Sequence, residues 1–233
     1  MPMSLRARVR RLIPAPLHNK MMLRFPSLYR LSFVNFETNM SLEGMSDLRK
    51  VLNDVAILPG DIIECGSSRC GTSILITRHL SSLKRHKKVY ALDSFQGFDV
   101  AELERERSLG LVDTPDDAFT STNFEYVVTK LRQLSYEDTI IPVRGYFENT
   151  LPSIAHASEF ALAFIDCDLR ESIIYCADTL WPKLVPGGVM AFDDYIAVDF
   201  RGARLAVDDF VSRRQADIES HGMFQRLYCV KKR

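Results

Sequence analysis

Two patterns of apolar and polar positions alternate along this chain of 233 residues. Short unbroken apolar runs are typical of strands buried on both faces, whereas apolar residues spaced three and four apart are typical of helices. The unbroken runs predict strands at 61–65, 89–93, 139–145, 160–166, 187–194 and 224–232. The wider spacing predicts helices at 45–58, 71–83, 118–134, 147–155, 169–184 and 201–214.

Apolar strands that alternate with helices predict an α/β fold with a mostly parallel sheet. Right-handed crossovers then make the sheet doubly wound, with helices on both faces. The last strand comes after the polar stretch 217–223 and is expected to add antiparallel at an edge. Residues 96–117 are charged and are expected to form a loop, and Ser46 is the expected N-cap of the first helix.

The charge is balanced in total but uneven along the chain. Lys and Arg number 30, and so do Asp and Glu, which leaves no general electrostatic case for binding nucleic acid. Only basic charges precede the first acidic residue, Glu37. We interpret residues 1–45 as a basic N-terminal arm or lid in front of a domain at 46–233. A solvated arm is favoured over one that contacts a membrane surface or an anionic partner.

We expect no secretory signal and no membrane span, because no window reaches about 18 unbroken apolar residues. The 5 cysteines lack a C-x-x-C spacing, which favours reduced thiols over disulfides or a zinc site. These features predict a cytoplasmic protein. The 5 histidines are scattered and are expected to be ordinary surface or core residues.

Acidic residues stand at the ends of four predicted strands. Glu64 ends the first, Asp93 the second, Asp166 the fourth, and Asp193 with Asp194 the fifth. The carboxyl ends of parallel strands meet at one edge of such a sheet, where ligands bind. An ionised carboxylate there needs a partner or solvent, so the sequence predicts a polar binding site along this edge.

The segment 66–73 comes after the first strand and resembles a phosphate-binding loop, but Thr72 stands where that loop has its lysine. A G-x-G-x-x-G motif is absent as well, which argues against a nicotinamide oxidoreductase. Glu64 would repel a polyphosphate, whereas loop amides and a helix N-terminus suit a small carboxylate. We therefore predict S-adenosylmethionine here, with Asp93 accepting hydrogen bonds from the ribose hydroxyls. The alternative is a plain glycine-rich turn in which Asp93 caps a loop.

Asp166, Asp193 and Asp194 would offer oxygen ligands from adjacent strands, which suits Mg²⁺ better than zinc. Asp168 allows two interpretations. It could cap the following helix, because Glu171 stands three residues later, or it could be a general base beside the metal. We favour the base, because a sugar hydroxyl is too weak an acid to lose its proton unaided at neutral pH.

Six stretches between residues 59 and 210 resemble the Mg²⁺-dependent, S-adenosylmethionine-dependent sugar O-methyltransferases of the macrocin, mycinamicin and noviose type. They read PGDIIECGSSRCGTS, VYALDSFQGF, VRGYFENTLP, AFIDCDLRESI, LVPGGVMAFDDY and RGARLAVDDF. The resemblance implies a Rossmann-like, seven-stranded class I methyltransferase sheet. It also implies a sugar hydroxyl of a natural product or glycan as acceptor, and a dimer or larger homo-oligomer.

The resemblance further implies residue roles. Asp166, Asp193 and Asp194 would hold the metal, and Asp166 and Asp168 would lie at the reacting hydroxyl, with Asp168 as its base. The cofactor contacts would be Glu64, Gly66, Ser67, Gly71, Thr72, Asp93, Ser94, Phe95, Gly145, Tyr146 and Phe147. The arm and residues 96–117 would cover the acceptor.

The sequence departs from the family at Arg170, where an aromatic residue is more usual, and at Cys65 and Cys70 in the glycine loop. Arg170 and the stretch 96–117 therefore leave the acceptor open. Two other interpretations also stay open. One is an O-methyltransferase for catechol-type aromatic diols, and the other is a non-catalytic protein that binds a nucleotide.

Overall fold

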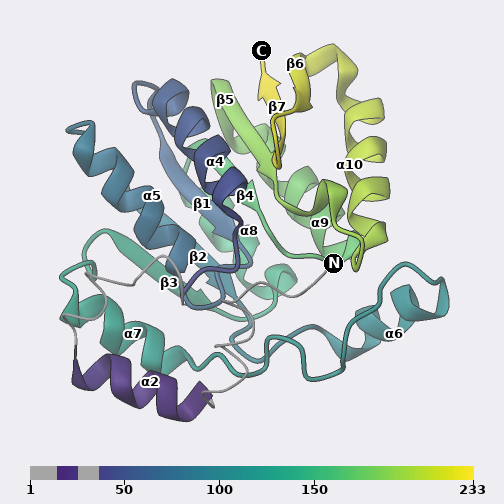
Figure 1. Cartoon of the computed structure of the whole chain (residues 1–233). Coiled ribbons are helices and arrows are strands. Elements are labelled where there is room, and N and C mark those ends of the chain that lie inside the picture. Colours follow the sequence, from purple (N-terminus) through teal and green to yellow (C-terminus); the bar gives the residue numbers. More distant parts are fainter. Residues whose placement is uncertain (1–14, 26–36) are drawn as a thin grey trace.

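The computed structural model describes residues 15–25 and 37–233, and within them the chain forms one seven-stranded sheet (Figure 1). The strand order is β3-β2-β1-β4-β5-β7-β6. The bounds are β1 Asp61–Cys65, β2 Val89–Asp93, β3 Ile140–Arg144, β4 Phe160–Ile165, β5 Leu184–Phe192, β6 Ile218–Met223 and β7 Tyr228–Lys232. β1 to β5 are parallel, and β7 and β6 add antiparallel at one edge. The predicted doubly wound, mostly parallel sheet is confirmed. The last strand is antiparallel as expected, but it lies between β5 and β6, so β6 and not the last strand forms the edge.

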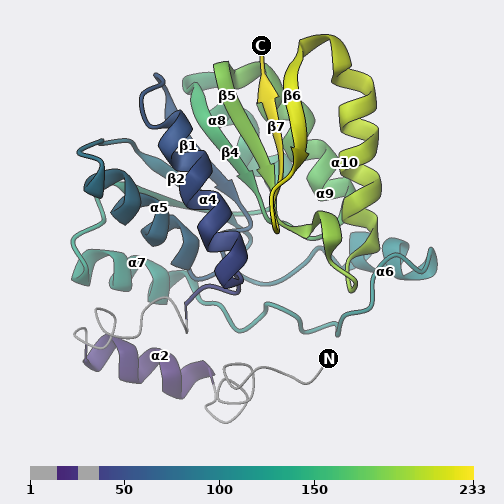
Figure 2. The ribbon, with the colours of Figure 1, turned by 45° about the horizontal axis from the view of Figure 1, so that its top comes forward.

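Helices cover both faces of this sheet (Figure 2). One face carries α4 Leu42–Val55, α5 Gly71–Ser82 and α7 Phe124–Gln133. The other carries α8 Phe147–Ala157, α9 Arg170–Leu180 and α10 Arg201–Arg214. The remaining helices are α2 Ala15–Arg24, which packs against α7, α6 Val100–Ser108, and the short 3-10 turns η1 Trp181–Lys183, η2 Asp194–Ile196 and η3 Gln215–Asp217.

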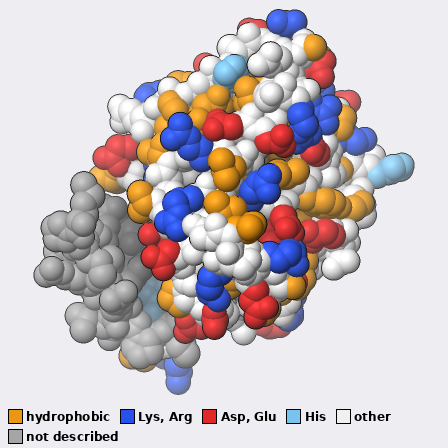
Figure 3. Space-filling view, turned by 90° about the vertical axis from the view of Figure 1, so that its right-hand side faces the viewer, with side chains coloured by type: hydrophobic (Ala, Val, Ile, Leu, Met, Phe, Trp, Pro, Cys, Tyr) orange, Lys and Arg blue, Asp and Glu red, His pale blue; other side chains and the backbone are white. Residues whose placement is uncertain are grey.

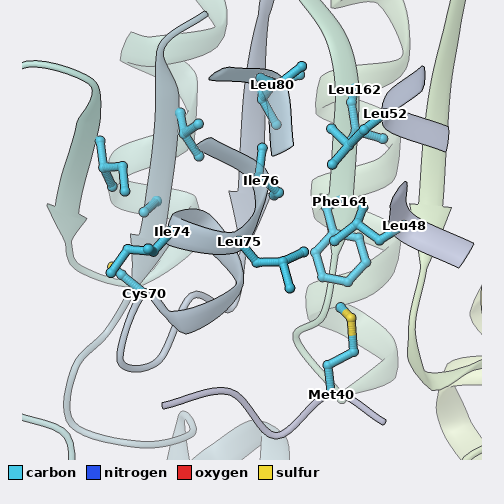
Figure 4. Close-up of a cluster of buried hydrophobic side chains, with 14 of the residues drawn as sticks. Met40, Leu48, Leu52, Cys70, Ile74, Leu75, Ile76, Leu80, Leu162 and Phe164 are labelled. Atoms are coloured by element: carbon cyan, nitrogen blue, oxygen red, sulfur yellow. The ribbon is translucent and has the colours of Figure 1, made fainter. Parts of the chain in front are cut away.

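Alternation along the central strands builds a hydrophobic core on each face. In β4, Leu162 and Phe164 join the core under α4 and α5, whereas Ala163 and Ile165 join the core under α9 and α10. Figure 4 shows the first of these cores, where Phe164 lies beside Leu48 of α4. Burial of such side chains contributes roughly 1.5–3 kcal/mol each. The two cores therefore hold the strands rigidly and fix where the strands end.

The first helix of the sheet region begins earlier than predicted. Ser41 is the N-cap of α4, and its hydroxyl accepts a hydrogen bond from the Gly44 amide at 3.1 Å. The prediction that Ser46 is the cap is therefore wrong, and the proposed domain boundary between residues 45 and 46 falls inside α4. Apolar residues at helical spacing follow both Ser41 and Ser46. Met45 packs in the core, and the helix therefore extends back to Ser41.

Three other boundaries differ from the prediction. Residues 96–117 contain α6, capped by Asp99, and its sequence VAELERERS is too polar to show a core-facing pattern. The stretch before the last strand forms β6, whose side chains are mostly exposed, so that no apolar run marks it. β5 begins at Leu184, because the predicted turn at 186–188 is an irregularity within the strand.

All five cysteines are buried and free in the structure. Among the described residues, no helix has both the length and the apolar character needed to cross a bilayer. Figure 3 shows the side of the molecule that carries α10 and α6, where basic and acidic side chains are interspersed. Ion pairs such as Arg213 with Asp209, 3.0 Å apart, belong to this mixed surface.

Candidate active site

A cavity of about 1080 Å³ lies at the carboxyl ends of β1, β2, β4 and β5. The strand order reverses between β1 and β4, which is where doubly wound sheets bind their ligands. The glycine loop after β1 lines one side and the aspartates after β4 and β5 line another, and segments within 37–40, 97–105 and 196–200 complete the wall. Ligand pockets typically measure about 300–1000 Å³, so this cavity has room for a cofactor and an acceptor together.

The structure brings together the three aspartates predicted to hold a metal. Asp166 comes directly after β4, and Asp193 and Asp194 come directly after the neighbouring strand β5. One carboxylate oxygen from each lies within 4.8 Å of the others. Burial raises the pKa of all three, and the neighbouring carboxylates add to the effect for Asp166 and for Asp194, whose pKa rises to about 7. Asp193 and Asp194 are buried and Asp166 is half-buried, and three like charges this close together favour a bound cation or a bound proton.

Arg226 also reaches this cluster, and no local feature of the sequence marks it. It lies just before β7 and lines the cavity, and its Nη2 atom is 3.5 Å from Oδ2 of Asp193. Its charge lowers the pKa of Asp193, though less than burial raises it. Oδ1 of Asp193 is buried and has no hydrogen-bond partner among the described residues. One arginine thus leaves most of the cluster's negative charge uncompensated.

Asp168 does not cap the following helix. α9 begins at Arg170, its N-cap is Leu169, and no side chain caps it from that position. Asp168 has a φ of +64°, and its backbone amide donates to Oδ2 of Asp194 at 3.2 Å. Burial and the charges of Asp194 and Asp193 hold its pKa well above the usual value. Asp168 therefore lines the cavity beside the cluster as a carboxyl group that binds a proton readily.

The glycine loop after β1 is shaped by close backbone contacts. Gly66 has a φ of +92°, and a Cβ there would overlap the Asp166 carbonyl. α5 begins at Gly71, and its N-cap residue, Cys70, provides no side-chain cap. Gly66, Ser67, Gly71 and Thr72 line the cavity as predicted. The uncapped N-terminus of α5 therefore faces the cavity and suits an anionic group.

Glu64 lies elsewhere than predicted. It is buried beneath the loop, where it accepts a hydrogen bond from the Ser73 hydroxyl, and it is not among the described residues that line the cavity. Burial, with a smaller contribution from Asp93, raises its pKa to about 8. At neutral pH it is therefore protonated and supports the loop from below. Glu64 therefore supports the loop instead of lining the cavity, and its predicted contact with the cofactor stays a prediction.

Asp93 and Ser94 line the cavity, whereas Phe95 does not. The two carboxylate oxygens of Asp93 accept hydrogen bonds from the Phe95 amide at 2.6 Å and the Ser68 amide at 2.8 Å. Asp93 thus orders the glycine loop and also faces the cavity, so both predicted roles fit. The Phe95 ring packs in the core against Phe124, with ring centroids 5.1 Å apart, so the ring points away from the cavity and its contact with the cofactor stays a prediction.

The segment after β3 matches the prediction in part. Tyr146 and Phe147 line the cavity at the start of α8. Gly145 has a φ of +143° and lies against Thr150, so it shapes the turn and is not part of the cavity wall formed by described residues. Arg170 is likewise absent from that wall, and its Cβ lies against Gly202 of α10.

A buried ion pair that sequence reasoning missed attaches the chain before α4 to the glycine loop. Lys130 of α7 and Glu37 are fully buried, and Nζ of Lys130 lies 2.8 Å from Oε2 of Glu37. Nζ also donates to the Arg69 carbonyl in the loop, and the Tyr126 hydroxyl donates to Glu37 at 2.9 Å. In the sequence Lys130 looks like an ordinary surface lysine of a helix.

Further contacts extend this attachment. The hydroxyls of Thr38 and Thr72 lie 3.0 Å apart, and Arg69 donates to Asn19 of α2 at 2.6 Å. His18, expected to be an ordinary surface or core residue, is buried and lines the cavity. The described part of the predicted arm therefore contacts the glycine loop, whereas residues 1–14 and 26–36 lie outside the described residues.

The family model described as Macrocin-O-methyltransferase (TylF) matches residues 37–223. Over 209 residues the chain is 30% identical to the 8-demethyl-8-(2,3-dimethoxy-alpha-L-rhamnosyl)-tetracenomycin-C 4'-O-methyltransferase of Streptomyces olivaceus, with 81% of this chain and 75% of the relative covered. Over 176 residues it is 30% identical to the demethyldecarbamoylnovobiocin O-methyltransferase of Streptomyces niveus, with 70% and 63% covered.

Solved structures show the same fold. The O-methyltransferase NovP superposes with a TM-score of 0.69 at 23% identity, over 84% of this chain and 82% of that one. The calicheamicin methyltransferase CalS11 gives a TM-score of 0.70 at 17% identity, over 99% and 94%. The sheet is thus that of the class I methyltransferases, as expected. Because the family model spans most of its length, this chain belongs to the macrocin O-methyltransferase (TylF) family.

Proposed function

We propose that the protein transfers the methyl group of S-adenosylmethionine to a hydroxyl group of a sugar and requires Mg²⁺ at Asp166, Asp193 and Asp194. The observation that carries the proposal is the meeting of these three carboxylates in one cavity, in a chain of an O-methyltransferase family. The rhamnosyl group in the name of the S. olivaceus relative supports a sugar as the acceptor.

The three aspartates fit a hard divalent cation. Their oxygens are close enough to share one ion, and Oδ1 of Asp193 is buried without a hydrogen-bond partner among the described residues. Mg²⁺ takes oxygen ligands and keeps some positions for water or substrate. When bound, it would lower the pKa of a coordinated substrate hydroxyl. The same role with zinc would call for nitrogen or sulfur ligands, which this cluster lacks.

The glycine loop and its neighbours fit the parts of S-adenosylmethionine. The amides at the N-terminus of α5, from Gly71 and Thr72, would receive its carboxylate. Asp93 would accept hydrogen bonds from the ribose, and Tyr146 and Phe147 would border the nucleoside. The cofactor supplies a methyl group on a sulfonium, which is a good leaving group, so the protein needs no covalent nucleophile.

Asp168 would remove the proton of the acceptor hydroxyl. Its carboxyl group lines the cavity next to the cluster, where it would lie beside a hydroxyl bound there and could accept its proton. The wall segments within 37–40 and 97–105 would enclose the acceptor and exclude water. The rest of the rate would come from holding hydroxyl and methyl donor in line. A homo-oligomer and a cytoplasmic location remain predictions.

The experiment is a methyl-transfer assay with labelled S-adenosylmethionine, rhamnosyl and other deoxysugar glycosides, and catechol. We expect transfer to a glycoside that a chelator abolishes and added MgCl₂ restores. If only catechol is methylated, the acceptor is an aromatic diol and not a sugar. Binding of S-adenosylmethionine without transfer to any acceptor would favour a non-catalytic protein, and turnover that survives the chelator would remove the metal from the proposal.

A further inference from the structure

The first turn of α9 is capped by another helix. α9 begins two residues after Asp168, and its own N-cap residue provides no side-chain hydrogen bond. The amides of a first helical turn need acceptors from elsewhere. Here they donate to two carboxylates of α6: those of Arg170 and Glu171 to Glu106, and that of Ser172 to Glu102 at 2.8 Å.

The Glu106 side chain lies between the first turns of α9 and α10. Its side chain is 2% exposed, and its Oε2 atom is buried without a hydrogen-bond partner among the described residues. A Cβ at Gly202, in the first turn of α10, would overlap this oxygen. The carboxyl group thus lies close to the N-termini of both α9 and α10, whose amides need acceptor oxygens. A glycine at position 202 leaves the room that this requires. Burial raises the pKa of Glu106 to about 7, and the bonds from the Arg170 and Glu171 amides oppose that rise only in part.

Glu102 repeats the arrangement one turn earlier in α6. Its second oxygen accepts a hydrogen bond from the Ser172 hydroxyl at 2.7 Å, in addition to the bond from the Ser172 amide. An exposed pair of hydrogen bonds from Arg105 to Glu171, 2.6 and 3.1 Å long, joins the same two helices. Glu102 and Glu106, two of the three buried residues of α6, therefore attach this helix to the start of α9.

The start of α9 in turn determines where Asp168 lies. Only Leu169 separates Asp168 from the first helical residue, and the Leu169 amide is bonded back to the Cys167 carbonyl at 2.6 Å. Asp168 also holds a left-handed backbone conformation, which costs a non-glycine residue on the order of 1 kcal/mol and persists only when the surroundings impose it. Loosening the first turn of α9 would release that constraint.

We propose that Glu102 and Glu106 are positioning residues, which cap α9 from α6 and thereby hold Asp168 in place at the acidic cluster. The inference rests on the proposed function for its link to methyl transfer. The capping itself does not depend on turnover. The charged helix that looked like a loop in the sequence thus becomes part of the support of the site.

The test uses Glu106→Ala, which removes the cap, and Glu106→Gln, which keeps an acceptor oxygen. Glu104→Ala is the matched control, because Glu104 is an exposed glutamate of the same helix. Amide hydrogen exchange over residues 166–175, Mg²⁺ affinity by calorimetry, and kcat and KM are measured on each. For Glu106→Ala we expect exchange to speed up about tenfold or more, and kcat to fall about tenfold with the KM for S-adenosylmethionine unchanged.

Glu106→Gln is expected to recover most of the exchange protection and of kcat, and Glu104→Ala to match the wild type. If Glu106→Ala does not fold, Ser172→Ala removes one hydroxyl bond to Glu102 and should give a smaller change of the same kind. Unchanged exchange over 166–175 overturns the proposal. Faster exchange with unchanged Mg²⁺ affinity and kcat reduces α6 to a purely structural role and overturns it too.

A wild type that methylates no acceptor would defeat the proposed function and not this inference. Exchange and Mg²⁺ affinity would still decide whether Glu106 holds Asp168 in place. For Mg²⁺ we expect Glu106→Ala to bind about tenfold more weakly. The Asp168 amide donates to Oδ2 of Asp194, so a shift of Asp168 would disturb a ligand support, and losing such supports typically weakens metal binding about tenfold or more.

Discussion

Two groups of buried charges lie in the wall of the same cavity and are satisfied in opposite ways. Glu37 has its cation inside the protein, with Nζ of Lys130 at 2.8 Å and the Tyr126 hydroxyl at 2.9 Å. The cluster of Asp166, Asp193 and Asp194 has only Arg226 among the described residues, at 3.5 Å from one of its oxygens. The first group is complete without a ligand, and the second is not.

The difference separates stability from function. Removing one partner of a complete buried pair leaves a charge without compensation, which is strongly destabilising. Removing one of several like charges relieves repulsion and so does not lower stability. It lowers activity only if a ligand from outside the chain binds at the cluster. Glu64 shows a third solution, in which a buried carboxyl group keeps its proton. Substitutions that alter the ion pair, the aspartate cluster or the protonated carboxyl group one at a time can therefore distinguish their roles.

Asp193→Asn should have the largest effect on activity. It keeps the shape of the side chain and removes one charged ligand, so we expect methyl transfer to fall by about a thousandfold, equivalent to roughly 4 kcal/mol. The metal-free protein should be as stable as the wild type or more stable. Calorimetry with Mg²⁺ tests the loss of the metal ligand, and urea unfolding in chelator tests the stability of the metal-free protein. Asp209→Asn, an exposed aspartate of α10, is the control, and normal Mg²⁺ affinity in Asp193→Asn would remove this residue from the metal site.

Lys130→Met should mainly lower stability, in contrast to Asp193→Asn, which should mainly lower activity. Glu37 would stay buried without its cation, and the free energy of unfolding should fall by about 3–5 kcal/mol. Combining it with Glu37→Gln should restore most of that loss, because the uncompensated charge is then gone. Urea unfolding of both variants measures this. Arg132→Met, exposed on the same helix, should change little, and a Lys130→Met variant as stable as this control would contradict the role of the pair.

Glu64→Gln tests the proton-bound carboxyl group through pH. The pKa of Glu64 is about 8 in the folded protein against 4.5 ordinarily. Its contribution to folding is therefore complete below about pH 4.5 and lost as the pH rises through about 8. Because glutamine cannot ionise, the variant should gain stability over the wild type as the pH rises across this range, by on the order of 3 kcal/mol. Thermal unfolding of both proteins at pH 5 and pH 9 measures this difference. If the two proteins lose equal stability between these pH values, Glu64 is not buried in its protonated form.

Asp93→Ala should weaken S-adenosylmethionine binding by about tenfold to a hundredfold, since a hydrogen bond to a charged group contributes roughly 1.5–3 kcal/mol. The change also removes the acceptor for the Ser68 and Phe95 amides. Asp93→Asn keeps one acceptor oxygen for the loop and so separates the two roles. Calorimetric titration with the cofactor measures both variants. Equal affinity in all three proteins would exclude Asp93 from the cofactor site.

Residues placed by the ends of strands were predictable from the sequence, and residues placed by distant contacts were not. Asp166, Asp193 and Asp194 were found because each stands at the end of a buried strand, and parallel strands place their carboxyl ends together. Glu37 and Lys130 are 93 positions apart, and nothing local marks them as partners. The same limit hid Arg226 and the capping of α9 by α6.

The side-chain directions that the sequence did not reveal have a physical cause as well. Alternation along a strand puts neighbouring residues on opposite faces, and a loop after a strand can turn a side chain into the core. Glu64 and Phe95 both sit beside true cavity residues, yet one points beneath the loop and the other packs against Phe124. Position next to a motif therefore predicted the place of the backbone and not the direction of the side chain.

Ser41→Ala and Ser46→Ala give the smallest expected effect and test this limit at a helix start. Ser41 accepts the Gly44 amide, so its loss should cost about 1 kcal/mol. Ser46 is exposed inside α4, where alanine is the better helix former, so its replacement should be neutral or stabilise by up to about 0.5 kcal/mol. Urea unfolding of the two variants should therefore shift in opposite directions. A loss at Ser46 with none at Ser41 would mean that α4 begins where the apolar spacing begins, and that residues 42–45, which lead from Glu37 to the core, are not helical in solution.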